Sequence, residues 1–123
     1  MANAHVHLEQ ARHNEVLRSS IPDTHPDWEL TVIFYSALHY VRSFLSGRSV
    51  GYSADDLRYD MLGHFLKLER EPQIAHNFDI LRNLSYDSRY KCRSMSWAFQ
   101  QMTVAERALK ALKTRVGELG VSH

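Results

Sequence analysis

The sequence predicts an all-α fold, an antiparallel bundle of four or five helices in a single domain that spans residues 1–123. Three observations support this prediction. Apolar residues recur at spacings of three and four in several long segments, as on one face of a helix. Breaks rich in proline, glycine and serine separate these segments, and no stretch shows the alternation typical of a strand. The chain of 123 residues can also bury a sizeable core without metal or disulfide bonds.

The first two predicted helices span residues 3–19 and 26–46, separated by a turn with two prolines. Segment 26–46 is the longest apolar segment and is expected to be the central core helix, with Asp27 as its cap. Its apolar stripe consists of residues 30, 33, 34, 37, 38, 41, 44 and 45.

A polar and aromatic edge runs along a neighbouring face of this central helix. It consists of Trp28, Tyr35, His39 and Arg42. Because such an edge borders the core without belonging to it, we look there first for function. The alternative is that Tyr35 and His39 are buried residues whose hydrogen bonds are satisfied within the fold.

Three further helices complete the predicted bundle, at about 56–71, 73–90 and 95–119. Ser53 or Asp55 is expected to cap the first of them, and Gly63 inside it indicates a closely packed neighbour or a bend. The last helix is the most regular, and Gly120 is expected to end it. Its apolar seam consists of Met95, Ala98, Met102, Ala105, Leu109, Leu112, Val116 and Leu119.

Composition limits the classes of function. A formal charge of +1 gives no global argument for nucleic-acid binding, so such binding must depend on local charge. A single cysteine cannot form an internal disulfide bond. With no signal peptide and no apolar run of membrane-spanning length, a cytoplasmic protein without membrane contact is expected. No cofactor is expected.

A local basic stripe does occur near the end of the fourth predicted helix. Arg82, Tyr86, Arg89 and Arg93 fall at offsets of four, three and four, and Tyr90 lies beside them. Positive charge interleaved with aromatic rings is typical of surfaces that contact phosphate and stack bases. The alternative is that the arginines pair with acids such as Asp79 and Asp87 while the tyrosines cover the bundle edge.

These segments resemble bacterial members of the HEPN family, named for nucleotide binding in higher eukaryotes and prokaryotes. The resemblance lies in Asn14, Asp27-Trp28, Phe34-Tyr35, Ala37-Leu38-His39 and Ser88-Arg89-Tyr90, and it covers residues 14–90. It implies a bundle of four or five helices, frequent homodimers, and nucleotide or RNA association in toxin–antitoxin or defence systems. The candidate binding residues are Tyr35, His39, Arg82, Tyr86, Arg89, Tyr90 and Arg93.

Ribonucleolytic members of this family place an arginine, then a polar residue, and a histidine four to six positions after the arginine. In the fourth predicted helix Arg82-Asn83 begins this pattern, but no histidine follows before His123. Arg58 and His64 repeat the spacing on the third predicted helix, where His64 would act as base and Arg58 would stabilise the phosphorane. The alternative is a solvated arginine and a partly exposed histidine.

Three functions therefore stay open. The leading one is a HEPN-like module that binds a nucleotide or RNA without its own catalysis, with a cognate partner protein. The second is a metal-independent endoribonuclease that uses Arg58 and His64. The third is a metal site formed by His13, His39 and His64 or His76.

A homodimer is also expected, because the last predicted helix carries apolar residues outside its seam. These residues are Trp97, Phe99 and Val104.

Overall fold

The structure, a computed structural model, describes residues 4–22, 24–46, 59–91 and 93–120. Within these ranges it contains five helices and no strand, which confirms the predicted all-α class. The helices are α1 (Ala4–Ser19), α2 (Pro26–Ser46), α3 (Tyr59–Leu68), α4 (Pro72–Tyr90) and α5 (Met95–Glu118). None of them is both long enough and apolar enough to cross a membrane.

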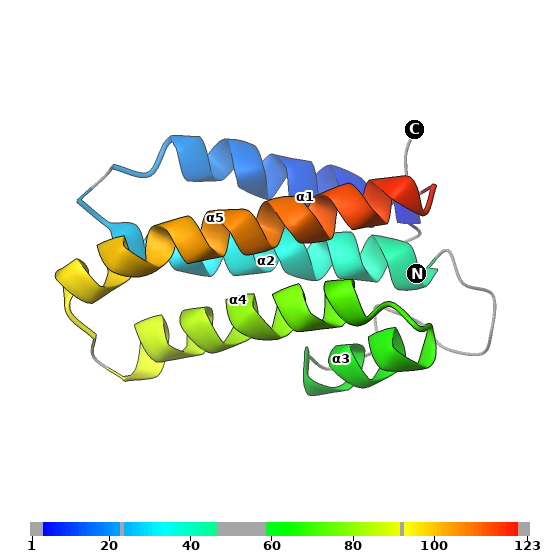
Figure 1. Ribbon diagram of the computed structural model, residues 1–123. Coiled ribbons are helices and arrows are strands. Elements are labelled where there is room, and N and C mark those ends of the chain that lie inside the picture. The colour runs from blue at the N-terminus through cyan, green and yellow to red at the C-terminus, as the bar shows by residue number, and fades with distance from the viewer. Residues whose placement is uncertain (1–3, 23, 47–58, 92, 121–123) are drawn as a thin grey trace.

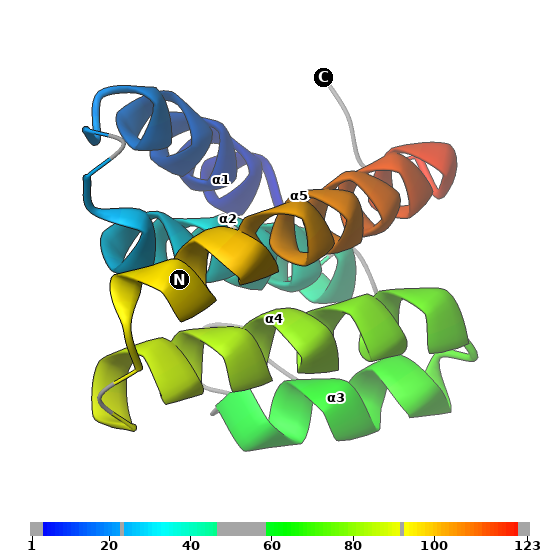
Figure 2. The ribbon, with the colours of Figure 1, turned by 60° about the vertical axis from the view of Figure 1, so that its left-hand side comes forward.

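Helix α2 occupies the centre of the bundle and packs against α1, α4 and α5, whereas α3 lies mainly against α4 (Figures 1 and 2). Figure 1 shows that α1 and α4 run opposite to α2, while α5 runs in the same direction as α2. The start of α2 is therefore close to the end of α4 and the start of α5. This end of the bundle holds most of the predicted binding residues.

The core is built around the apolar stripe of α2. All eight predicted stripe positions are buried, with relative exposure of 0 to 1%. The Phe34 ring packs against that of Phe78 on α4, with ring centroids 5.7 Å apart. A central helix needs such a broad stripe because it is covered on several sides at once.

The start of α2 differs from the prediction. Helix α2 begins at Pro26, and the amide of Glu29 donates to the carbonyl of His25 (3.2 Å), so Asp27 lies inside the first turn and does not cap it. Proline is well suited to the first helical position, where an N–H would have no partner. Helix α3 is described from Tyr59 onward, and the predicted caps Ser53 and Asp55 lie outside the described residues.

The seam of α5 is confirmed along most of its length. The seam positions from Ala98 to Leu119 are buried or half-buried. Met95 is 42% exposed because it belongs to the first turn, at the end of the bundle. Ser94 caps the helix by accepting a hydrogen bond from the Trp97 amide (3.1 Å). Gly120 follows the helix with φ of 88°, as the prediction requires.

Charged side chains connect α1 to α5. Arg18 donates to Glu106 (Nη2–Oε1 2.7 Å), and Lys113 lies 3.2 Å from Glu15 Oε2. Glu15 also accepts the hydroxyl hydrogen of Tyr40, whose ring is buried in α2. Burial first, and then this hydrogen bond, raise the pKa of the Tyr40 hydroxyl above its ordinary value.

Candidate functional site

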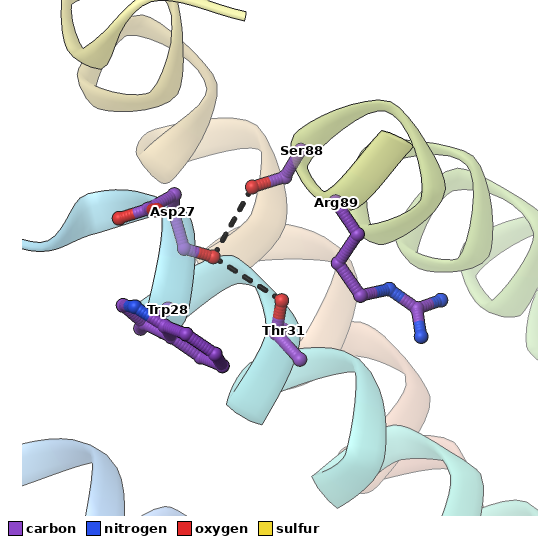
Figure 3. Close-up of a pocket in the computed structure, with 5 residues that line it drawn as sticks. All are labelled: Asp27, Trp28, Thr31, Ser88 and Arg89. Atoms are coloured by element: carbon purple, nitrogen blue, oxygen red, sulfur yellow. Dashed lines mark hydrogen bonds between the residues drawn. The ribbon is translucent and has the colours of Figure 1, made fainter. Parts of the chain in front are cut away.

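A cavity of about 170 Å³ opens between the start of α2 and the end of α4 (Figure 3). Five residues line it: Asp27, Trp28, Thr31, Ser88 and Arg89. Pockets for whole small molecules usually measure about 300 to 1,000 Å³. The cavity therefore has room for one ring or one phosphate group, with the rest of a ligand lying on the surface outside.

The Asp27 carbonyl forms the base of this cavity. It accepts hydrogen bonds from the hydroxyls of Thr31 and Ser88, each at 3.2 Å, and Figure 3 shows both hydroxyls converging on it. The bond from Ser88 connects the end of α4 to the start of α2. The Asp27 carboxylate turns away, and its buried Oδ1 has no hydrogen-bond partner within the described ranges.

Arg89 supplies the positive charge of the site. Its Nε donates to the Ser85 carbonyl (3.3 Å) and its Nη1 donates to the Tyr35 hydroxyl (3.4 Å). Its guanidinium carbon lies 5.2 Å from the ring centroid of Tyr90 and 6.0 Å from that of Tyr35. In the described part of the chain no carboxylate lies within 4.0 Å of this guanidinium, so its charge is available to an anion.

Exposed aromatic rings surround Arg89. Trp28 on α2 is 60% exposed, and Tyr86 and Tyr90 on α4 are 51% and 63% exposed. The two tyrosine rings lie 5.0 Å apart and tilted, one helical turn from each other. Such rings offer flat faces on which a base can stack.

The structure divides the predicted basic stripe. Arg82 pairs with Asp79 (3.8 Å) one turn away, as the alternative reading expected. Arg93 does not belong to the helical face at all, because α4 ends at Tyr90. It instead approaches Asp87 (3.8 Å), and its guanidinium carbon lies 5.3 Å from the ring centroid of Trp97.

His39 is outside the cavity and faces α1. Its Nδ1 lies 3.0 Å from the Nδ1 of His7, and the two rings stack with centroids 5.3 Å apart. One of these nitrogens must donate and the other accept, since each has a single position for a hydrogen or a lone pair. Sequence reasoning did not predict this contact with His7, which is 6% exposed. This contact favours the reading of His39 as a packing residue.

The predicted catalytic pair cannot be placed, because Arg58 lies outside the described residues. His64 is exposed on α3, with its ring edge-on to Phe65 at 5.6 Å. The pair therefore stays a prediction.

The predicted metal site is wrong for the histidines named. His13, His64 and His76 are exposed on three different helices, and His39 is engaged with His7. Across the described residues, no group of three or more histidine, cysteine, aspartate or glutamate side chains is close enough to hold a metal ion.

Comparison of the chain with protein-family models, with curated proteins and with solved structures gives no significant match.

Proposed function

We propose that this protein is a helical module that binds a nucleotide or single-stranded RNA at the cavity between α2 and α4, without catalysis of its own. One observation carries the proposal. Arg89 is held by hydrogen bonds beside exposed aromatic rings and has no carboxylate partner in the described chain. A cation and stacking rings in one place suit a ligand that has both phosphate and base.

The binding mode follows from the size of the cavity and the position of the rings. A phosphate meets the Arg89 guanidinium, and the adjacent base stacks on Trp28 or on the Tyr86 and Tyr90 rings outside the cavity. Arg82 and Arg93 contribute less in this proposal, because each already lies near a carboxylate.

The resemblance to the HEPN family supports the same class of ligand. Ser88-Arg89-Tyr90 and Asp27-Trp28, which carry part of that resemblance, also contribute to the cavity or its rim. The resemblance further suggests a homodimer and a cognate partner protein in a toxin–antitoxin or defence system, and both belong to the proposal.

The test is the affinity for a short labelled single-stranded RNA, measured by fluorescence anisotropy in a chelating buffer at several salt concentrations. Arg89→Gln is expected to weaken binding about tenfold and to lower the slope of log affinity against log salt by about one. Arg82→Gln removes the same charge from the same helix and is expected to change little, since Arg82 is paired with Asp79. Tyr86→Ala is expected to cost about 1 to 3 kcal/mol of stacking at every salt concentration.

Two outcomes would contradict the proposal. If wild-type protein shows no salt-dependent binding to RNA or to mononucleotides, the site around Arg89 is only a solvated helix end. If the RNA is cut during the incubation, the ribonuclease alternative that uses Arg58 and His64 takes the place of a silent binding module.

A further inference from the structure

A second and larger cavity lies at the opposite end of α4 from Arg89. It measures about 410 Å³ and lies between the start of α4 and the last turns of α5. Gln73 lines it from α4, and Arg107, Lys110, Thr114, Arg115 and Glu118 line it from α5. It is an open depression on the surface, so a ligand in it would stay partly exposed to solvent.

The acids near this cavity are already engaged by one arginine. Arg115 holds Glu71 through two contacts (Nε–Oε1 2.7 Å, Nη2–Oε2 3.2 Å), and its Nη1 lies 3.5 Å from Glu118. Glu71 is only 9% exposed, so this forked pair is a fixed part of the wall. The hydrogen bond to Glu71 raises the pKa of Arg115, which keeps its charge.

Two other basic residues that line this cavity do not pair with an acid among the described residues. Arg107 and Lys110 are exposed, and in the described part of the chain neither has a carboxylate within 4.0 Å. By contrast, the next basic residue along α5, Lys113, pairs with Glu15. The cavity therefore keeps two positive charges that no carboxylate of the described residues compensates.

The spacing of the donors defines the shape of the ligand. Arg107, Lys110 and Thr114 follow one another at offsets of three and four, so they share a face of α5 over about 10 Å of helix axis. This length exceeds that of a single phosphate and suits several in a row. A guanidinium fork, an ammonium group and a hydroxyl are also donors that phosphate oxygens accept.

We propose that this cavity binds a chain of two or three adjacent phosphate groups, either as a free oligophosphate or as the triphosphate of a nucleotide. The site is separate from the one around Arg89 and does not depend on the proposed function there. The shared chemistry of both sources is the linear triphosphate.

The experiment is calorimetric titration of the whole protein with inorganic tripolyphosphate, with a nucleoside triphosphate and with citrate. The double variant Arg107→Gln, Lys110→Gln is expected to lose about tenfold in affinity for tripolyphosphate, since it removes two charged contacts. The matched control is Lys67→Gln, Arg70→Gln, which removes two exposed charges that also have no carboxylate within 4.0 Å among the described residues. This control is expected to retain wild-type affinity.

Amide chemical shifts of wild-type protein provide a second measurement that needs no variant. Tripolyphosphate is expected to shift the amides of Arg107, Lys110 and Thr114. Equal affinity for tripolyphosphate and the nucleoside triphosphate identifies the phosphate chain as the ligand, whereas tighter binding of the nucleotide means that its base contributes as well. The proposal is overturned if tripolyphosphate does not bind, if citrate binds as tightly, or if the Lys67 and Arg70 control loses as much affinity.

Discussion

The variant His39→Ala tests whether the His39 side chain packs within the fold or binds a ligand. His39 contacts His7 at 3.0 Å between their Nδ1 atoms, and His7 is 6% exposed. In His39→Ala the nitrogen of His7 loses this partner in a place that water barely reaches. We therefore expect a loss of stability with RNA binding unchanged.

The magnitude follows from these contacts. A buried group left without its hydrogen-bond partner costs about 1 to 3 kcal/mol, and the loss of the ring contact adds about 0.5 to 1 kcal/mol. Together they give about 1.5 to 4 kcal/mol. For a domain of this size such a loss lowers the melting temperature by about 10 °C.

Thermal unfolding followed by circular dichroism measures this effect, and the anisotropy assay with labelled RNA measures binding in parallel. His13→Ala is the control, because His13 is exposed on the same helix as His7. The double variant with His7→Ala should show a coupling energy of about 1 kcal/mol with His39→Ala, as expected for residues in contact. The reasoning is refuted if His39→Ala melts at the wild-type temperature while its RNA affinity falls.

Three further predictions concern a helix interior, alkaline pH and assembly. Gly63→Ala should raise stability by about 0.5 to 1 kcal/mol in urea unfolding, because the added Cβ would lie 3.6 Å from Asp79 Oδ1, an ordinary contact; a loss would show that α3 needs the glycine. The pKa of the Tyr40 hydroxyl is raised in the folded state, so the stability that Tyr40 contributes should be complete below about pH 10 and decline above it. In urea unfolding at a series of pH values, Tyr40→Phe should lack the share of this decline that comes from Tyr40. An equal decline in both proteins would contradict this. A homodimer is expected from light scattering, and Phe99→Ser, which alters a 52% exposed ring, should shift it toward monomer; a monomeric wild-type mass at micromolar concentration would refute it.

The fold could be predicted because its signals are local. The stripe of α2 repeats with the period of a helix, and every position of that stripe is buried. The predicted end of the fourth helix at Tyr90 is confirmed as well, whereas the placement of Arg93 on its face is wrong for a reason that is also local. Ser94 caps α5, and a cap-forming serine so close behind Arg89 indicates that the helix cannot continue to Arg93.

The candidate site could be predicted only in part. The neighbourhood of Arg89 and Tyr90 follows from helical spacing, but Ser88 and the Asp27 carbonyl are 61 positions apart in sequence. Which turn of α2 meets which turn of α4 depends on the packing of whole helices, so no local pattern indicates this bond. The contact between His7 and His39 has the same origin, since nothing near His7 shows which helix it will face.

The position of α1 at the edge of the bundle affects how the protein opens. In the described part of the chain, the backbone of α1 comes close to that of α2 and not to that of α5. Two ion pairs connect α1 to α5, Arg18 with Glu106 and Glu15 with Lys113. Both are partly exposed, so dissolved ions weaken them. We therefore expect α1 to detach as a separate cooperative unit before the other helices unfold, and its amides to exchange with solvent faster than those of α2 as ionic strength rises.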